Sequence, residues 1–339
     1  MERVGLIFLD RPSLLEQVEL AQYAEQQGFE SVWVCETRLV RDAVTPLAAF
    51  ATKTNRIKLA TGVVNNWTRT SGLMAMTLAT LQELSGGRMM MGIGSYWDPL
   101  AFNQGIRRRK TLSAMREYVT VVRRLLNLET VTYEGEVVKV RDLRLDLGHE
   151  VPRSPKEVPI YIGATGPRMM ELAGEIADGV FHNFFTSVGY LRESLQRVKT
   201  GAERAGRRIQ DIDMPQMMAV AMSEDAESAR NTARYAVAMY MGQQPHIAKA
   251  SGVDEEVIQH IHDTMGGWPP KEGGIESAMS LVGDDMIDLL CAAGTPEMCR
   301  QTVQKYLDNG ASYPVLCPLT PNIREIIDAF SPLQIPGSK

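Results

Sequence analysis

The chain has 339 residues, of which 44% are hydrophobic and 23% are charged, and its formal net charge is -5. This length allows a large core, and the acidic balance gives no support for a nucleic-acid partner. No apolar run reaches the roughly 18 residues that a membrane span requires. The first ten residues are too short for a signal peptide and end in an aspartate, so a cytoplasmic protein is expected.

The cysteines and histidines do not form the pattern of a metal site. The four cysteines have no Cys-x-x-Cys spacing, and without an export signal they are expected to be free thiols. Among the five histidines, His260 and His262 lie two apart, which on a helix points them to different faces. The sequence therefore predicts that no metal is bound.

Short apolar segments recur along the chain, and most of them precede a stretch with helical periodicity. Because they are apolar at consecutive positions, they are typical of parallel strands that are buried on both faces. The expected strands are residues 4–8, 31–34, 57–62, 89–94, 158–162, 179–181, 214–222 and 313–316. The expected helices are residues 13–27, 45–53, 71–84, 112–126, 167–176, 187–205, 225–240, 285–292, 296–309 and 322–330. This alternation predicts an α/β fold, a (β/α)8 TIM barrel that forms a single domain over residues 1–339.

Two segments interrupt the alternation. Residues 130–157 contain alternating valines around Gly135, which predict a β-hairpin, and then a polar, proline-rich linker. Residues 241–282 are rich in glycine and proline around short helical pieces, and we interpret them as a lid-like insertion. Both segments are expected to be insertions into the barrel series.

Polar and aromatic residues follow several of the expected strands, and the densest group is the turn of residues 65–70, Asn-Asn-Trp-Thr-Arg-Thr. In a (β/α)8 barrel the carboxyl ends of the strands carry the active site, so these residues are expected at one mouth. They are Glu36, Thr37, Asn65, Asn66, Trp67, Arg69, Tyr96, Trp97, Asp98, Thr165, His182 and Asn183. They include no cysteine–histidine or serine–histidine pair, so hydrolysis by a nucleophile finds no support. A wide mouth with aromatic residues and glycines suits a flat heteroaromatic cofactor, which supplies the difficult chemistry itself.

The turn of residues 163–167, Gly-Ala-Thr-Gly-Pro, is the strongest candidate for a phosphate site. Its small residues let the backbone approach a ligand, and it opens a helix whose first N–H groups favour an anion. Glycine and proline are also ordinary before helices, so the pattern alone leaves a plain turn as the alternative. The residues of this site are Gly163, Ala164, Thr165, Gly166 and Pro167.

Three blocks of the chain resemble a known family. They are LATGVVNNWTR and ATLQELSGGRMMMGIG within residues 57–94, PIYIGATGPRMMELAGEIADGV in residues 159–180, and AAGTPEMCRQTVQKYLDNGASYPVL in residues 292–316. In this order they resemble the bacterial luciferase-like flavin and deazaflavin oxidoreductases. The most similar branch is that of methylenetetrahydromethanopterin reductase, which uses the deazaflavin coenzyme F420.

The resemblance implies an enzyme that transfers hydride between coenzyme F420 and a small organic substrate. The reaction would reduce a C=C, C=N or C=O bond or run in reverse, and the cofactor phosphate would bind at residues 163–167. Two alternatives remain open. One is an FMN-dependent monooxygenase of the same superfamily, and the other is a non-catalytic relative that binds flavin or has lost it.

The resemblance also assigns roles to single residues. Relatives have a cis peptide bond at the place of Gly62 and Val63, in a bulge that backs the middle ring of the cofactor. Where the deazaflavin branch usually has Asp-His, this chain has Glu36 and Thr37, so the imidazole that some relatives use in proton transfer is missing. We interpret Glu36 either as a general acid or base, or as a hydrogen-bond partner of the cofactor or of a neighbouring backbone amide.

The remaining assignments concern the two sides of the ring. Thr37 and Asn65 are expected to bind the cofactor, Asn65 through a hydrogen bond at the ring edge. The substrate side is expected to consist of Trp67, Tyr96, Trp97, Asp98 and His182. The helices expected at 71–84 and 112–126 carry much apolar surface, and because relatives often dimerise on this side of the barrel, a homodimer is predicted.

Overall fold

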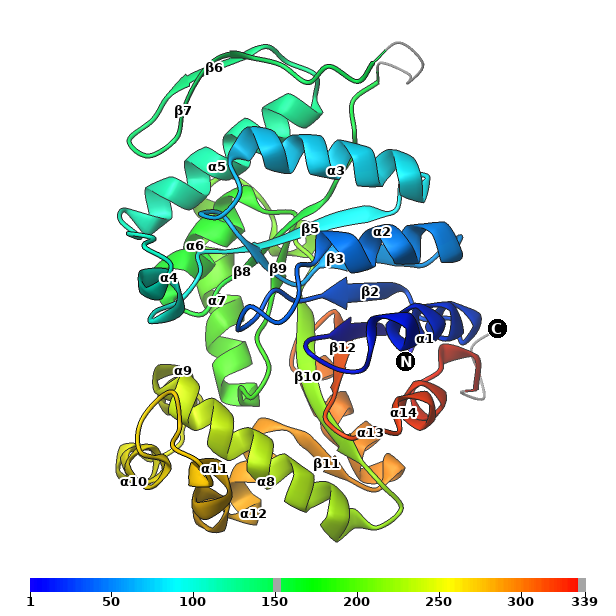
Figure 1. Cartoon of the computed structure of the whole chain (residues 1–339), viewed down its shortest axis with the longest axis vertical. Helices are drawn as coiled ribbons and strands as arrows, with labels where there is room; N and C mark the ends of the chain where they lie inside the picture. Colours follow the sequence, from blue (N-terminus) through cyan, green and yellow to red (C-terminus); the bar gives the residue numbers. More distant parts are fainter. Residues whose placement is uncertain (149–153, 335–339) are drawn as a thin grey trace.

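The computed structural model describes residues 1–148 and 154–334, and at its centre a parallel sheet curls into a barrel (Figure 1). The strands coincide with the expected apolar segments, as consecutive apolar residues are buried on both faces of such a sheet. The barrel strands are β1 (Gly5–Phe8), β2 (Ser31–Val34), β3 (Lys58–Thr61), β5 (Met89–Gly94), β8 (Ile160–Gly163), β9 (Gly179–Phe181), β10 (Pro215–Met222) and β12 (Tyr313–Pro318). The fold class predicted from the sequence is confirmed.

Parallel pairing fixes the strand order around the barrel. β1 pairs with β2 and with β12, and the order continues from β2 through β3, β5 and β8 to β9. β12 pairs in turn with β10. Two single bridges, Gly179 to Asp213 and His182 to Gln216, join β9 to the start of β10 and close the circle. The carboxyl ends of the strands therefore meet at one mouth, where a (β/α)8 barrel holds its ligands.

The helices cover the outside of the barrel and begin and end at the residues that their sequences favour (Figure 1). The side chains of Ser13, Thr70 and Ser187 cap α1, α3 and α7 by accepting backbone N–H groups, and Gly86 ends α3 at φ 67°. The helices are α1 (Leu14–Gln26), α2 (Val44–Lys53), α3 (Ser71–Ser85), α4 (Leu100–Asn103), α5 (Thr111–Leu126), α6 (Pro167–Ile176), α7 (Val188–Arg204), α8 (Ala226–Gln243), α9 (Pro245–Ala250), α10 (Glu255–Met265), α11 (Gly274–Ala278), α12 (Asp284–Leu290), α13 (Pro296–Leu307) and α14 (Ile323–Ala329). None of the helices in the described ranges has the length and apolar character that crossing a bilayer requires.

The barrel has one apolar layer inside the sheet and another between the sheet and the helices. Inside, Trp33 stacks on Phe181 with ring centroids 4.4 Å apart, and it packs against Tyr161 in a T-shaped arrangement with centroids 5.4 Å apart. On β1, Ile7 belongs to this inner layer, whereas Leu6 and Phe8 belong to the outer one. Successive side chains of a strand thus pack alternately into the inner and the outer layer. Because both layers are apolar, the sequence of each strand is a continuous apolar run.

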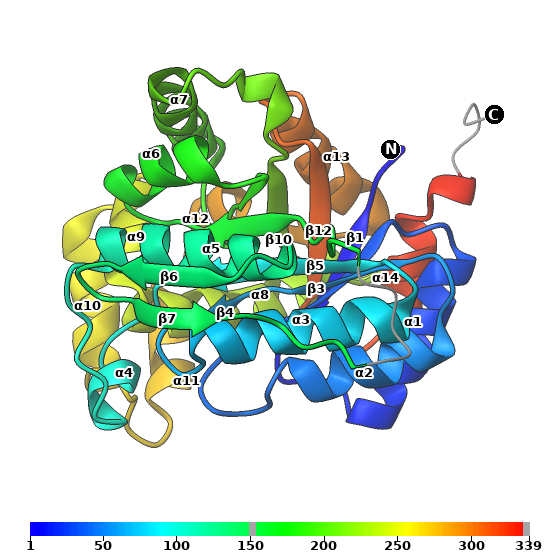
Figure 2. The ribbon, with the colours of Figure 1, turned by 90° about the horizontal axis from the view of Figure 1, so that it is seen from above.

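The expected hairpin is present as β6 (Val131–Glu134) and β7 (Lys139–Leu143), which pair antiparallel. It lies across the outside of the barrel over α5 (Figure 2). The carboxylate of Glu117 on α5 accepts backbone N–H groups of Glu136, Val137 and Val138 at 2.8–2.9 Å, which fixes the hairpin turn to the helix. Residues 149–153 of the predicted linker lie outside the described residues.

The segment predicted as a lid-like insertion is helical. It begins in the last turn of α8, continues through α9, α10 and α11, and packs against α8 in an apolar core of its own. Figure 1 shows these helices gathered with α12 at the end of the molecule opposite the hairpin. The short helical pieces expected there are present as α9, α10 and α11, whereas the status of this segment as an insertion and its movement as a lid stay predictions.

Two short strands were not expected from the sequence. β4 (Val64–Asn65) pairs with the end of β5, although the sequence predicts a turn there. β11 (Ala292–Gly294) pairs with the carboxyl end of β10, where the sequence predicts that the helix continues to residue 292. Both are too short to show a periodicity, and they exist because longer neighbouring strands offer free hydrogen-bonding edges.

Candidate active site

The floor of the barrel mouth is an aromatic layer with a backbone bulge above it. The peptide bond between Gly62 and Val63 is cis, as the family resemblance implies. A Cβ added to Gly62 would lie 3.0 Å from the Cβ of Trp33, so the bulge rests closely on the Trp33 ring system. The side chain of Val63 stands above this floor, at the carboxyl end of β3.

Val63 has room only because two neighbouring strands end in glycine. A Cβ added to Gly94, at the end of β5, would lie 2.9 Å from a methyl group of Val63, and one added to Gly163 would lie 3.2 Å from it. Real Cβ contacts are rarely that short, so side chains at these two positions would push Val63 and the bulge out of place. The bulge therefore forms a small, apolar platform at the centre of the mouth.

Glu36 lies at this mouth, but both of its carboxylate oxygens are engaged. Arg69 forms a bidentate ion pair with it, with N–O distances of 2.8 and 2.7 Å, and the backbone N–H of Ala43 donates to Oε1 at 3.1 Å. The hydrogen bond to Glu36 raises the pKa of Arg69 above its ordinary value. These contacts favour the interpretation of Glu36 as a hydrogen-bond partner of a neighbouring amide, and its role as an acid or base stays a prediction.

The polar turn after β3 is held by its own side chains. Oδ1 of Asn65 accepts the backbone N–H groups of Trp67 and Thr68, each at 2.9 Å, which shapes the turn. The indole N–H of Trp67 donates to the carbonyl oxygen of Ser95 at 3.1 Å and ties this turn to the end of β5. Asn65 lines a cavity, whereas Trp67 lines neither of the two cavities described below, so the structure does not bring Trp67 into the site.

The loop after β5 does reach the mouth. Tyr96, with φ 63°, Trp97 and Asp98 all line a cavity there. Arg108 fixes this loop by donating to the carbonyl oxygen of Tyr96 at 2.8 Å and by pairing with the Asp98 carboxylate. The predicted position of these three residues at the substrate side is compatible with the structure, and their contact with a substrate stays a prediction.

His182 was predicted to bind substrate, but the structure buries it between the sheet and α7. Strand side chains alternate between faces, so Phe181 points into the barrel and His182 points outward. Its Nδ1 lies 3.1 Å from the hydroxyl of Ser194 on α7, and Nε2 has no partner among the described residues. Burial lowers the pKa of His182 to about 4, so it is a neutral core residue near pH 7. The prediction that it contacts substrate is wrong.

The glycine-rich turn after β8 has the geometry of a ligand loop. Gly163, Ala164 and Thr165 line the cavities, and α6 begins at Pro167 as expected. The hydroxyl of Tyr190 on α7 donates to the carbonyl oxygen of Thr165 at 2.9 Å and holds the loop in place. A Cβ added to Gly166 would meet nothing within 4 Å, so there is open space at the start of α6. Gly166 and Pro167 themselves do not line the cavities.

Two connected cavities occupy the mouth. The larger one has a volume of about 1170 Å³ and extends toward β1, β12 and α8, and the smaller one, of about 640 Å³, extends toward the loop after β5 and the insertion. Both are lined by Glu36, Val63, Trp97, Gly163, Thr165, Asn183, Gln243 and Gln244. The bulge thus lies at their junction. Together they exceed the usual size of a single small-ligand pocket and leave room for a cofactor and a substrate.

Several residues of the larger cavity were not predicted from the sequence. Thr37 lines it as predicted, but so do Asp10 and Arg11 after β1, Met217 on β10 and Tyr240 on α8. Asp10 and Arg11 could have been predicted, because they lie two and three residues after an expected strand and active-site residues follow the carboxyl ends of barrel strands. Nothing in the sequence indicates which face of α8 turns toward the mouth.

The insertion contributes to the smaller cavity. Its lining includes Pro245, His246, Ile247 and Trp268. His246 is therefore the histidine of the insertion that faces the mouth, whereas His260 and His262 do not line either cavity.

The mouth has no activated nucleophile of its own in the described ranges. Cys35 and Cys317 line the larger cavity, but burial raises the pKa of the Cys35 thiol to about 12 and that of Cys317 above its ordinary value. A protonated thiol is a poor nucleophile. The described residues also contain no group of three histidine, cysteine or acidic side chains that could hold a metal ion. The arrangement is suited to binding and orienting a flat cofactor.

A closed barrel with a bulge and two joined cavities at the carboxyl ends of its strands defines an enzyme-like site of the (β/α)8 class. The family model described as luciferase-like monooxygenase matches residues 4–313, and the chain belongs to this family. It is 31% identical over 326 residues to a 5,10-methylenetetrahydromethanopterin reductase of Methanolobus tindarius, across 95% of this chain and 96% of that protein.

Other similar proteins are named as F420-dependent enzymes. An F420-dependent glucose-6-phosphate dehydrogenase of Nakamurella multipartita is 29% identical, with 87% of this chain and 84% of that protein covered. Among solved structures, the F420-dependent tetrahydromethanopterin reductase of Methanopyrus kandleri superposes with a TM-score of 0.85 at 27% identity, over 96% of both chains. An F420-dependent secondary alcohol dehydrogenase shares the fold with a TM-score of 0.78 at 19% identity, over 100% of this chain and 99% of that one.

Proposed function

We propose that this protein is a coenzyme F420-dependent oxidoreductase that transfers hydride to or from a small organic substrate. The proposal is carried by one observation, the Val63 platform between Gly94 and Gly163 at the junction of the two cavities. It is supported by two relatives named as F420-dependent enzymes, which match 87% and 96% of this chain. The reaction reduces a C=C, C=N or C=O bond of the substrate, or oxidises the corresponding single bond.

The residues present fit the deazaflavin. Val63 would back the ring, Asn65 and Thr37 would lie near its edge, and the open space at Gly166 would take the phosphate at the start of α6. When bound, the deazaflavin supplies the hydride chemistry. The protein orients the ring against the substrate, and the apolar platform keeps water from one face.

A titration of the purified protein with F420 and with FMN tests this proposal. We expect F420 to bind with a dissociation constant in the micromolar range, about -8 kcal/mol, and FMN to bind at least about tenfold more weakly. Quenching of the cofactor fluorescence measures both. Tighter binding of FMN would favour the alternative of a luciferase-like monooxygenase, and binding of neither would favour a non-catalytic relative.

We also propose a homodimer in the cytoplasm. The outer face of α3 exposes Leu73, Met76 and Leu84 to 44%, 53% and 46%, and α3 carries Glu83 as its charged residue. A helix face of this kind needs a partner, and a second copy of the chain would bury it. The four cysteines are free, as expected for a reducing compartment.

Met76→Glu is expected to convert the dimer into a monomer, because it places a charge in the proposed contact. The matched control is Leu15→Glu on α1, where the leucine is 80% exposed and lies on another helix. Light scattering at micromolar concentration measures the mass. A monomeric wild-type protein, or a dimer unaffected by Met76→Glu, would contradict the proposal.

A further inference from the structure

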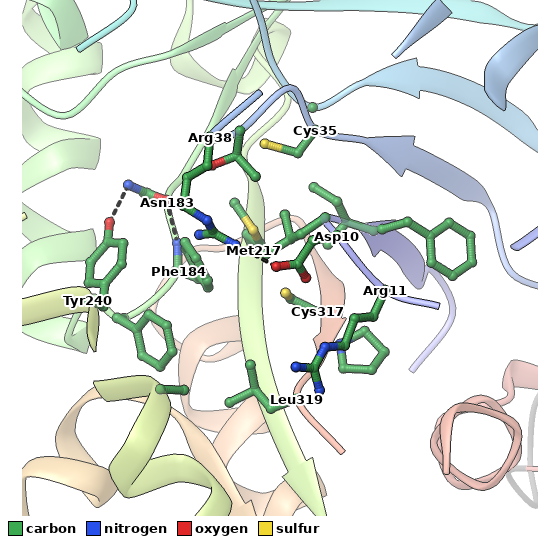
Figure 3. Close-up of a pocket in the computed structure, with 18 of the residues that line it drawn as sticks. Asp10, Arg11, Cys35, Arg38, Asn183, Phe184, Met217, Tyr240, Cys317 and Leu319 are labelled. Carbon is green, nitrogen blue, oxygen red and sulfur yellow. Dashed lines mark hydrogen bonds and ion pairs between the residues drawn. The ribbon is translucent and has the colours of Figure 1, made fainter. Parts of the chain in front are cut away.

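The larger cavity continues well beyond the Val63 platform, toward the loops after β1 and β12. Its wall on one side is apolar and aromatic: Phe184 and Tyr240 pack edge to face with centroids 4.9 Å apart, and Met217, Cys317 and Leu319 continue the surface. Asn183 donates to the Tyr240 hydroxyl at 2.7 Å and so fixes the ring orientation (Figure 3). This wall suits the apolar body of a ligand.

One edge of the same cavity, formed by the loops after β1 and β2, carries charge. The charged side chains of its lining are Asp10, Glu16, Glu36, Arg11, Arg38 and Arg41. Arg38 pairs with Asp10 at 2.5 Å, and Arg69 pairs with Glu36 from outside the lining. Two arginines then remain against one exposed carboxylate, that of Glu16 in the first turn of α1. This edge is therefore positive overall.

Arg11 is the guanidinium group of this edge that is available to a ligand. It is exposed, and no hydrogen bond or ion pair of its side chain is found among residues 1–148 and 154–334. Its backbone is fixed, because Nη1 of Arg41 donates to the carbonyl oxygens of both Asp10 and Pro12 at 3.0 Å. In the view of Figure 3, the Arg11 side chain points toward Leu319.

The loop that presents Arg38 has an unusual backbone. Arg38 and Leu39 have φ values of 50° and 57°, and consecutive left-handed residues other than glycine are uncommon. Such conformations concentrate at functional sites, where the surrounding contacts hold them. Here they place the Arg38 guanidinium against Asp10, so that the Asp10 carboxylate does not repel an anion next to Arg11.

This charged edge lies far from the phosphate turn. β1 and β8 are separated in the barrel by β2, β3 and β5 on one side and by β9, β10 and β12 on the other, so they stand opposite each other. An anion at Arg11 is thus a different group from a phosphate at the start of α6. The Val63 platform lies between the two, at the carboxyl end of β3.

We propose that the larger cavity binds a substrate with a carboxylate on an apolar or aromatic body, and that Arg11 holds the carboxylate. The body lies along Phe184, Tyr240 and Leu319. This proposal rests on the proposed function, because it places the substrate on the side of the platform away from the cofactor phosphate. A charge-assisted hydrogen bond to a guanidinium then selects acids over neutral compounds of the same shape.

Phenylpropanoate and phenylpropanol are matched probes, since they differ in the carboxylate alone. Calorimetry measures both affinities, and we expect the wild-type protein to bind the acid at least about tenfold more tightly than the alcohol. Arg11→Gln should remove this preference and change the affinity for the alcohol less than about twofold. Glu16→Gln should strengthen binding of the acid. The matched control is Arg141→Gln on the hairpin, whose side chain is 81% exposed, and it should change nothing.

F420 titrations of the same variants separate this proposal from the proposed function. If Arg11→Gln leaves F420 affinity unchanged and abolishes the preference for the acid, the assignment stands. F420 could also fail to bind to the wild-type protein and to every variant, while the wild-type protein still prefers the acid and Arg11→Gln does not. In that case the proposed function is wrong and the acid site stands. The proposal is overturned if the wild-type protein binds acid and alcohol equally or not at all, or if Arg11→Gln weakens F420 instead of the acid.

Discussion

Arg69→Gln is expected to lower the free energy of unfolding by about 3 kcal/mol, because it leaves the Glu36 carboxylate without its counter-charge. The two side chains are largely buried, with exposed fractions of 18% and 16%. Removing one partner of such a pair is far more costly than removing both, since a single charge remains in a poorly solvated place. Chemical denaturation of the purified variant measures the change.

A double-mutant cycle is the control for this prediction. Glu36→Gln keeps an oxygen that can accept the Ala43 N–H, and the double variant Glu36→Gln/Arg69→Gln has no unpaired charge. We expect the double variant to be more stable than Arg69→Gln alone, with a coupling free energy of about 2 kcal/mol. Additive effects of the two single substitutions would show that the pair contributes little.

The same variants distinguish the two interpretations of Glu36. If the pair holds the loop after β2 against the turn after β3, both single variants should weaken F420 binding to a similar degree. If Glu36 handles a proton, Glu36→Gln alone should lower turnover by about 10²–10⁴-fold and leave F420 affinity intact. The bidentate geometry favours the first outcome.

The barrel could be predicted from the sequence because its determinants are local. Consecutive apolar residues indicate buried parallel strands, and caps such as Ser13 and Thr70 or stops such as Gly86 fix the helices between them. The hairpin was predictable for the same reason. β4 and β11 were not, because a strand of two or three residues depends on the edge that it meets.

The candidate site was predictable only where a residue lies within three positions of the end of an expected strand and faces inward. Glu36, Asn65 and Gly163 satisfy both conditions, whereas His182 satisfies the first and fails the second, because it is one residue out of register with the barrel interior. Trp67 does not line the cavities, and its indole N–H donates to a backbone carbonyl oxygen in a neighbouring loop. Such pairings depend on tertiary contacts that a single sequence does not reveal.

Gly166→Val is expected to weaken F420 binding by at least about tenfold and to leave the fold intact. The backbone of Gly166, at φ -106° and ψ 148°, is ordinary for valine, and an added Cβ meets nothing within 4 Å. The branched side chain would therefore fill only the open space at the start of α6, where the phosphate is proposed to bind. Fluorescence titration measures the affinity, and thermal unfolding measures the fold.

The phosphate-free deazariboflavin and a second glycine complete this experiment. The deazariboflavin should bind equally well to the wild-type protein and to Gly166→Val, because it places nothing at α6. Gly189 is the matched control, since it lies in the first turn of α7 after the next barrel strand, and a Cβ there comes no closer than 3.5 Å to the Ser187 hydroxyl. Gly189→Val should leave both affinities unchanged. If Gly166→Val weakens the binding of the deazariboflavin as much as that of F420, the valine acts by distorting the loop after β8 and the phosphate binds elsewhere.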